Sequence, residues 1–475
     1  MKIVEQVFKT NDIRGEYPDE IDEKFAYLLG QAIGEIIGAE NVVIGRDSRL
    51  SSPSLSASLA AGVEQAGGKI ASLGICPAEL TYYAVTAEKH FDHAVMVTAS
   101  HNPPRDNGFK IVDENALPVT CESGLKDVKK WMAQATPPQI CPVAREADYS
   151  LRKEYVDFAV EIAGIPETKG MKIAIDPANG TGGILWDRLS EATGIRPLRL
   201  NFEPDGRFPS HAPNPAKRKN LKLLKDKVNS ENANLGLAYD GDADRTVAVT
   251  DDGKIVDGSG MIALLIEYLF GKDKNACCAV SMTTSRNVLE WMRNRGMEPA
   301  IVPVGHAKVK RIMNDRADID FAGEESGHYF YRSLSNCESS ILTSLNLFHL
   351  LARRRLKPVL RELAAKWKRP VSEPEFPFDE RKKSTEVCRS AAERFLHGAP
   401  EPLEIMCEHN GEIIRNCTTA DIRDSNGVRV DFEDWWFAVR PSGTEPLVRL
   451  TGEAYSHEAI AGKLAPLKKW LQVNK

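Results

Sequence analysis

The sequence predicts an α/β protein of several domains, because of its length and a repeated alternation of strands and helices. The chain has 475 residues, and a length of this order favours roughly three or four domains. Short apolar runs rich in β-formers alternate with amphipathic segments over most of the chain. This alternation is typical of βαβ units with mainly parallel sheets. In such folds, active-site residues gather in the loops that follow the C-terminal ends of strands.

The predicted elements repeat one pattern three times. The first part of the chain shows a helix at residues 54–65 and strands at residues 41–45, 69–73 and 94–98. The pattern returns with strands at residues 172–176, 235–239, 276–282, 300–304 and 319–322. The last part differs, with a helix near residues 386–395 and then several strands, among them 435–439 and 447–450.

Three boundaries divide the chain. The proline-rich residues 136–142 precede a helix that begins near Leu151, and a turn at residues 251–253 closes a second segment. Residues 368–378 contain three prolines and indicate a linker. We therefore expect three topologically similar α/β domains and a smaller C-terminal α+β domain, at residues 1–146, 147–253, 254–369 and 370–475.

Composition excludes several classes of function. The net charge is −5, and short basic runs without aromatic neighbours argue against a nucleic-acid surface. The longest apolar run, residues 261–270, includes Glu267 and is too short to span a membrane. The nine cysteines include no Cys-x-x-Cys pair, which argues against a disulfide framework or a zinc site. We expect a cytoplasmic protein that binds neither nucleic acid nor membrane.

The first loop whose residues could take part in a reaction is residues 98–104, TASHNPP, which follows an apolar strand. It places Ser100 at a strand exit, where a hydroxyl can act as a nucleophile. The alternative is a plain turn, since Asn-Pro is turn chemistry. A hydrolase of the Gly-x-Ser-x-Gly type is excluded, because that motif does not occur in the chain.

The second loop is residues 240–245, DGDADR, directly after the strand at residues 235–239. If this segment is extended, its alternate carboxylates point to one side. Such carboxylates would repel each other without a cation, and oxygen ligands select Mg²⁺ or Ca²⁺. An EF-hand is excluded, because Arg245 and Asp251 stand where its glycine and glutamate belong.

Two further loops carry polar groups. Residues 323–328, GEESGH, offer carboxylates, a hydroxyl and an imidazole to sugar hydroxyls, although a flexible acidic loop explains them equally well. Residues 440–446, RPSGTEP, combine an arginine with hydroxyls and free N–H groups, which suits a phosphate dianion. Residues 258–263 match a dinucleotide fingerprint, but no acidic residue follows near Ser281, so a tight strand-to-helix turn is favoured.

Together with residues 11–15, NDIRG, these loops resemble the α-D-phosphohexomutase superfamily, most closely its bacterial phosphomannomutase/phosphoglucomutase members. The resemblance covers essentially the whole chain. It implies four domains around a central active-site cleft. In chain order, they would contribute a phosphoserine loop, a metal-binding loop, a sugar-binding loop and a phosphate-binding loop.

The resemblance also implies residue roles. Ser100 would be the phosphoserine, and its oxygen would join Asp240, Asp242 and Asp244 in holding Mg²⁺. Four residues would surround the transferring phosphate: Arg14, His101, Lys110 and Arg245. Either Lys110 or His101 can serve as the base. Substrate contacts would come from Gly305, His306, Glu324, Glu325, Ser326, Gly327 and His328. The second phosphate would be held by Arg440, Ser442, Gly443 and Thr444.

The implied activity is interconversion of hexose 1-phosphate and hexose 6-phosphate, of mannose and/or glucose, through a bisphosphorylated intermediate. Hexose 1,6-bisphosphate would be the activator, and the enzyme would be a monomer or small homo-oligomer. Phosphoglucosamine mutase is the alternative, and departures at Asn11, Ser281 and Val304 leave the sugar open. A serine-phosphorylated phosphatase would use water as acceptor. A non-enzymatic relative is disfavoured because Ser100 and the aspartates are all present.

Overall fold

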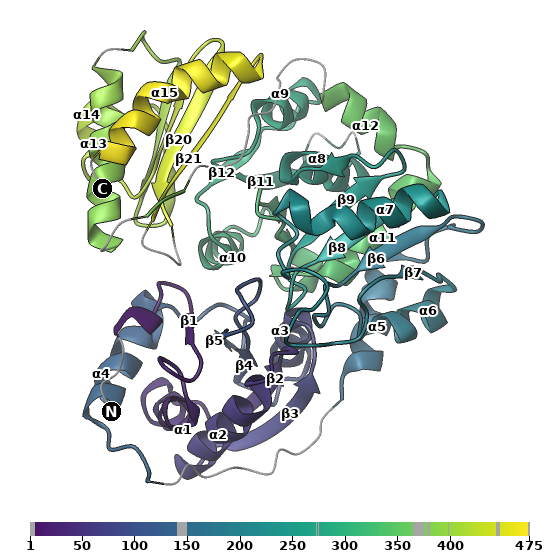
Figure 1. Cartoon of the computed structure of the whole chain (residues 1–475), viewed down its shortest axis with the longest axis vertical. Coiled ribbons are helices and arrows are strands. Elements are labelled where there is room, and N and C mark those ends of the chain that lie inside the picture. Colours follow the sequence, from purple (N-terminus) through teal and green to yellow (C-terminus); the bar gives the residue numbers. More distant parts are fainter. Residues whose placement is uncertain are drawn as a thin grey trace. The chain divides into compact units, whose positions relative to one another are not determined.

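The computed structural model describes residues 5–139, 150–271, 273, 275–363, 375–377, 381–397, 399–442 and 447–473. The chain forms two compact units (Figure 1). The first unit comprises residues 1–257 and 326–356, and the second comprises residues 258–325 and 357–475. The chain therefore leaves the first unit after residue 257, returns to it at residue 326 and leaves it again after residue 356.

The first sheet of the first unit has the strand order β1-β5-β4-β2-β3. Strands β3, β2 and β4 are parallel to one another. Strand β5 pairs antiparallel with β4, and β1 pairs antiparallel with β5. This register places Arg14 opposite Gly108 and Lys110 opposite Met96. The strands are β1 (Ile13–Glu16), β2 (Asn41–Arg46), β3 (Lys69–Ile75), β4 (His93–Val97) and β5 (Asp106–Asp113).

Helices α1 (Glu23–Ala32) and α2 (Ser52–Gln65) pack against each other and bury apolar faces in the core of this sheet. Asp22 caps α1 by accepting from the Phe25 N–H over 2.8 Å. The helices approach closely at Gly30, where a Cβ atom would lie 2.1 Å from the Leu59 carbonyl oxygen. Helices α3 (Ala78–Ala87) and α4 (Lys126–Gln134) complete this part of the unit.

The second sheet of the first unit has the order β10-β9-β8-β6-β7. Strands β7, β6 and β8 are parallel, and β8 and β9 form an antiparallel hairpin in which Tyr239 pairs with Thr246. Residues 240–245 are therefore the tip of a hairpin. The strands are β6 (Ile173–Asp176), β7 (Leu198–Arg199), β8 (Leu235–Tyr239), β9 (Thr246–Thr250) and β10 (Ile255–Val256), with helices α5 (Arg152–Ala163), α6 (Trp186–Thr193) and α7 (Lys222–Glu231).

The returning segment completes the first unit. It contains the antiparallel pair β14 (Tyr329–Tyr331) and β15 (Cys337–Glu338), followed by α11 (Ser340–Ala352). Ser339 caps α11 by accepting from the Leu342 N–H over 2.9 Å. Helix α11 bonds to β8, because the hydroxyls of Tyr239 and Ser344 lie 2.7 Å apart. The second α/β region is thus built from two stretches of sequence.

The second unit begins with three parallel strands in the order β12-β11-β13. They are β11 (Cys277–Ser281), β12 (Ala300–Val302) and β13 (Ile319–Gly323), with α8 (Gly258–Leu269), α9 (Arg286–Asn294), α10 (His306–Asp315) and α12 (Leu356–Leu363). As predicted, residues 258–263 begin a helix directly after a strand, since α8 follows β10 with one residue between them.

The C-terminal part of the second unit is a six-stranded antiparallel sheet in the order β16-β21-β20-β19-β17-β18. Figure 1 shows α13 and α15 covering one face of it, and their apolar residues form a single core with the strands. Its elements are β16 (Glu375–Pro377), α13 (Arg381–Leu396), β17 (Glu404–His409), β18 (Glu412–Ile414), α14 (Thr419–Ile422), β19 (Val428–Asp431), β20 (Trp435–Pro441), β21 (Leu447–Ala454) and α15 (His457–Val473).

The predicted α/β class is confirmed, with mixed rather than mainly parallel sheets in the first unit. The strand at residues 235–239 has the predicted bounds, and the ends of most other predicted strands lie within two residues of those observed. The exception is β21, which continues four residues beyond the predicted end at residue 450. Residues 375–377, predicted as linker, instead form β16 because they pair with β21. The expected boundaries after residues 146 and 369 lie outside the described residues. Within the described chain, no helix is long and apolar enough to cross a membrane.

Candidate functional site

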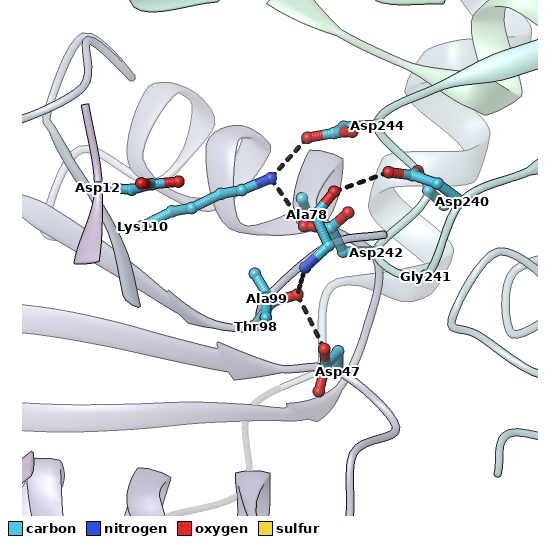
Figure 2. A network of polar contacts seen from close by, with 12 residues as sticks. Asp12, Asp47, Ala78, Thr98, Ala99, Lys110, Asp240, Gly241, Asp242 and Asp244 are labelled. Carbon is cyan, nitrogen blue, oxygen red and sulfur yellow. Dashed lines mark hydrogen bonds and ion pairs between the residues drawn. The ribbon is translucent and has the colours of Figure 1, made fainter. Parts of the chain in front are cut away.

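Ser100 lies in the loop between β4 and β5, in a backbone conformation that serine seldom adopts. Its φ angle is +51°, in the left-handed region that normally favours glycine. The Ser100 N–H donates to Thr98 Oγ1 over 2.8 Å, and the Thr98 hydroxyl donates to Asp47 Oδ2 over 2.8 Å (Figure 2). These bonds hold a strained residue in place, and such strain clusters at functional sites.

The hydroxyl of Ser100 points at the aspartate loop. It donates to Asp240 Oδ2 over 2.8 Å (Figure 2). Nδ1 of His101 lies 3.1 Å from the same hydroxyl oxygen. Ser100 and Asp240 are both buried. The candidate nucleophile and the candidate metal site, predicted from separate loops, are therefore in direct contact.

The three aspartates converge, but not by the predicted geometry. Residues 240–245 form a tight hairpin tip instead of an extended strand, and Ala243 has φ +60°. The hairpin curls because β8 turns back to pair with β9. Ligand atoms of Asp240, Asp242 and Asp244 lie within 4.8 Å of one another. Oδ1 of Asp242 is buried without a hydrogen-bond partner. Three buried carboxylates with a spare oxygen fit a hard divalent cation.

Lys110 on β5 bridges two of these carboxylates. Its ammonium group donates to Asp242 Oδ2 over 2.7 Å and to Asp244 Oδ2 over 2.5 Å (Figure 2). Burial by itself lowers the pKa of Lys110, but Asp242 and Asp244 outweigh it and raise that pKa above its ordinary value. Lys110 therefore carries its positive charge within the aspartate cluster.

The aspartates have divergent proton affinities. Burial and the charges of Asp244 and Asp242 raise the pKa of Asp240 well above its ordinary value. Burial also acts to raise the pKa of Asp244, but Lys110, His328 and Arg245 lower it well below its ordinary value. The pKa values of neighbouring carboxyl groups diverge in this way because the ionisation of one group makes the ionisation of the next less favourable.

Two arginines flank the site. The Arg14 guanidinium pairs with Asp12 over 2.8 Å and donates to the Ala99 carbonyl over 3.3 Å, so it lies against the Ser100 loop. The Arg245 N–H donates to Asp240 Oδ1 over 3.1 Å, and its Nε atom lies 3.2 Å from His328 Nε2. Both predicted arginines are therefore at the aspartate and serine loops.

The predicted sugar loop divides between the units. In the first unit, His328 Nε2 lies 3.3 Å from Asp244 Oδ1, and Ser326 Oγ lies 2.9 Å from His328 Nδ1. The Gly327 carbonyl accepts from the Thr246 N–H over 3.1 Å. Ser326, Gly327 and His328 thus belong with the aspartate loop.

In the second unit, Glu324 follows β13 and Gly305 precedes α10. The Gly305 N–H donates to Glu324 Oε1 over 2.6 Å, which places His306, the first residue of α10, beside Glu324. The carboxylate of Glu325 accepts a hydrogen bond from Ser259 at the start of α8. These residues form a polar group at the ends of parallel strands, as predicted.

The predicted phosphate loop is described in part. Arg440 is the penultimate residue of β20, and the buried Ser442 donates its N–H to the Leu447 carbonyl over 2.8 Å. Gly443 and Thr444 lie outside the described residues.

Sequence reasoning missed two groups, Asp47 and Thr98, that hold Ser100 in its conformation. Asp47 directly follows β2, just as Ser100 follows β4, and β2 and β4 are parallel neighbours. The strand-exit rule used for the four loops therefore applied to residues 45–49, GRDSR, as well. Chemically, the site combines a positioned hydroxyl, a metal-capable acidic triad and several cations, which suits transfer of an anionic group.

Comparison with known families identifies four domains of one family, in order along the chain. The family models for Phosphoglucomutase/phosphomannomutase match in order: alpha/beta/alpha domain I over residues 5–136, domain II over 153–253, domain III over 257–369 and the C-terminal domain over 379–465.

Individual relatives match over nearly their full length. A phosphomannomutase of Escherichia coli is 30% identical over 464 residues, covering 95% of this chain and 96% of the relative. A protein of Methanosphaera stadtmanae named as a probable phosphoglucosamine mutase is 31% identical over 480 residues, covering 97% of both. The crystal structure of a Phosphoglucomutase/phosphomannomutase family protein from Burkholderia thailandensis is 30% identical, covers 99% of this chain and 98% of that chain, and has a TM-score of 0.82. The chain belongs to the phosphoglucomutase/phosphomannomutase family of isomerases.

Proposed function

We propose that this protein interconverts hexose 1-phosphate and hexose 6-phosphate, of mannose and/or glucose, through a phosphorylated Ser100 and a bisphosphorylated sugar. The observation that carries this proposal is the 2.8 Å hydrogen bond from Ser100 Oγ to Asp240 Oδ2. It puts the hydroxyl of Ser100 in direct contact with the acidic triad. Membership of a phosphotransferring isomerase family supports the same chemistry.

In the proposed first step, the O–P bond of phosphorylated Ser100 breaks as a sugar hydroxyl oxygen forms a new O–P bond. The hydroxyl proton passes to His101, because Lys110 is already protonated, whereas burial and the charges of Arg245 and Arg14 lower the pKa of His101 well below its ordinary value. The product is the sugar bisphosphate. After the sugar turns around, the other phosphoryl group returns to Ser100 Oγ. The protein thus regains its phosphate, and the sugar has exchanged one phosphate position for the other.

This chain's residues mainly supply charge and position, which phosphoryl transfer requires. Arg14, Arg245 and Lys110 would neutralise the transferring group. Asp240, Asp242, Asp244 and Ser100 would hold Mg²⁺, which when bound stabilises negative charge on a phosphoryl group. Hexose 1,6-bisphosphate would act as activator by restoring phosphate to Ser100.

The second unit would recognise the sugar. We assign contacts with sugar hydroxyls to Gly305, His306, Glu324 and Glu325, with Ser326, Gly327 and His328 from the first unit. We assign the stationary phosphate to Arg440, Ser442, Gly443 and Thr444. Recognition through shared hydroxyls and phosphate leaves little discrimination at C2, so we expect use of both mannose and glucose.

We also propose the four domains at residues 1–146, 147–253, 254–369 and 370–475, each with one of the four loops. The proposed setting is a reducing cytoplasm. Every cysteine in the described part of the chain is a free thiol, which supports this setting; Cys141 lies outside that part. The proposed state is a monomer or small homo-oligomer.

The deciding experiment is a coupled mutase assay with glucose, mannose and glucosamine 1-phosphates, each with and without the 1,6-bisphosphate. We expect turnover of the first two, stimulated by bisphosphate, and loss of turnover in Ser100→Ala but not in Ser230→Ala, a change at an exposed serine on α7. A higher kcat/KM for glucosamine 1-phosphate than for the other two sugars would favour the phosphoglucosamine mutase alternative. The name of the Methanosphaera relative supports that alternative. Release of inorganic phosphate from the start would indicate a phosphatase.

A further inference from the structure

Arg49, in the loop after β2, is a buried arginine that the proposed chemistry does not use. Its side chain is wholly inaccessible to solvent. The guanidinium pairs with Asp47 through Nε at 2.9 Å. A buried guanidinium is retained at a cost unless all its donors are satisfied, and here every branch of the fork has a partner.

Those partners are backbone carbonyls of the Ser100 loop. Nη2 donates to the Ser100 carbonyl over 3.0 Å and to the Asn102 carbonyl over 2.8 Å. Nη1 donates to the Asp106 carbonyl over 2.8 Å and also to the Pro103 carbonyl. One rigid group thus gathers four carbonyls, from residue 100 to residue 106, and fixes the curvature of the whole loop.

Asp47 links the same cluster to the other side of Ser100. Its Oδ2 atom accepts from Arg49 Nε. The same atom accepts from the Thr98 hydroxyl, and Thr98 Oγ1 accepts from the Ser100 N–H (Figure 2). Since the Thr98 proton is directed at Asp47, the hydroxyl lone pair faces the Ser100 N–H. The N–H and the C=O of Ser100 are therefore both held by the Arg49–Asp47 pair.

A second loop of the first unit covers Arg49. The Phe208 ring centroid lies 5.2 Å from the guanidinium carbon. At Gly206, a Cβ atom would lie 2.4 Å from both the Arg49 Cα atom and the Ser48 carbonyl oxygen. The cover leaves no space for the guanidinium to swing away from the Ser100 carbonyl.

We propose that Arg49 is a positioning residue for phosphoryl transfer: with Asp47, it holds the backbone of Ser100 in its left-handed conformation and so aims the hydroxyl at Asp240. This rests on the proposed role of Ser100. A misplacement of about 1 Å at a reacting atom can reduce the rate on the order of a hundredfold. Arg49 would thus act on the rate of transfer, not on sugar binding.

The test is Arg49→Lys, which keeps the charge but replaces a planar fork with a point-like ammonium that cannot span four carbonyls. We expect kcat, and the rate at which glucose 1,6-bisphosphate phosphorylates the dephosphorylated enzyme, to fall about thirtyfold to a hundredfold. KM for glucose 1-phosphate should change less than about threefold, because no sugar contact is lost. Arg105→Ala, at a neighbouring arginine whose side chain is 70% exposed, should leave both unchanged.

A folded Arg49→Lys with wild-type kcat and phosphorylation rate would overturn the inference. If Arg49→Lys does not fold, Thr98→Val and Thr98→Ser decide instead. Valine removes the acceptor of the Ser100 N–H and should lower kcat at least tenfold, whereas serine should restore it. Equal kcat in both would also overturn the inference. Turnover that survives Ser100→Ala would instead reject the proposed function, whatever the Arg49 variants do.

Discussion

The ammonium group of Lys110 lies 2.5 Å from Oδ2 of Asp244, although 134 residues separate them in the sequence. Lys110 comes from β5 of the first sheet, and Asp244 comes from the hairpin tip of the second. The contact therefore joins two α/β regions of the first unit through a buried ion pair. Its consequences for stability are testable.

Lys110→Met should destabilise the protein most when divalent metal is absent. Removing one partner of a buried ion pair typically costs about 3–5 kcal/mol, because the remaining charge stays buried. Here Asp242 and Asp244 would also repel each other. A cation held by the triad relieves that repulsion, so Mg²⁺ should restore much of the lost stability.

Thermal unfolding of Lys110→Met with excess Mg²⁺ and with EDTA measures this effect. Lys153→Met is the matched control, because Lys153 makes an exposed ion pair with Asp157, and such pairs contribute little. An equal loss of Tm in Mg²⁺ and in EDTA would show that the metal and Lys110 do not share the same carboxylates.

Asp242→Asn should abolish most metal binding and most turnover. The change removes one charge from the triad and replaces a ligand oxygen, so we expect turnover to fall on the order of a thousandfold or more. Titration calorimetry with Mg²⁺ tests binding separately from activity. Asp251→Asn, at an exposed position after β9, should bind Mg²⁺ normally, and full wild-type activity in excess chelator would reject the site.

Glu79 should make the protein less stable as pH rises. This buried carboxyl on α3 accepts from the Tyr155 hydroxyl over 2.6 Å, and burial raises its pKa from 4.5 to about 7. The folded state therefore favours the protonated form. Its stabilisation is fully present below about pH 4.5 and is lost as pH rises towards 7, a change of about 3 kcal/mol.

Glu79→Gln should remove this contribution. Relative to wild type, the free energy of unfolding of the variant should improve by about 3 kcal/mol between pH 4.5 and pH 7.5. Urea unfolding at several pH values measures it, with Glu64→Gln at an exposed position of α2 as control. A pH dependence identical to that of wild type would refute the role of Glu79.

Gly30→Ala should destabilise the first unit by about 1–3 kcal/mol or more, since the close contact is with backbone that cannot rotate away. Gly62 makes the reciprocal contact, with its Cβ position 2.0 Å from the Tyr27 carbonyl oxygen. Gly462→Ala is the matched control in helix α15, where nothing lies within 4 Å. That change should stabilise the protein by about 0.5–1 kcal/mol, because alanine favours helix. Equal effects of the two changes on unfolding would contradict the packing argument.

The sequence identifies strands whose signal is local, such as β8, and it identifies the loops that follow them. It does not identify β5, because Asn107-Gly108 normally indicates a turn. The structure explains this glycine: a Cβ atom at residue 108 would lie 2.1 Å from the Ile13 carbonyl oxygen of β1. The need for glycine at residue 108 is set by a strand about 95 residues away, so the local sequence pattern does not reveal it.

The candidate site shows the same division. The triad of aspartates can be identified from the sequence because its members lie within five consecutive residues. The hairpin that brings them together is not the predicted geometry. The convergence of Ser100, Lys110 and the triad followed from resemblance alone. The contacts of Arg49 with backbone carbonyls and of Asp47 with the Thr98 hydroxyl were missed because each partner lies about fifty residues further along the chain, and no spacing rule connects them.

The first unit is built from two separate stretches of sequence, and this affects its folding during biosynthesis. Helix α11, which bonds to β8 through Ser344 and Tyr239, is translated about a hundred residues after that strand. Residues 258–325 of the second unit emerge from the ribosome in between. The second α/β region cannot complete its core until that inserted segment has been made, so its nascent strands remain exposed for longer than those of the first sheet. Cotranslational aggregation and chaperone capture should therefore concentrate on residues 173–250.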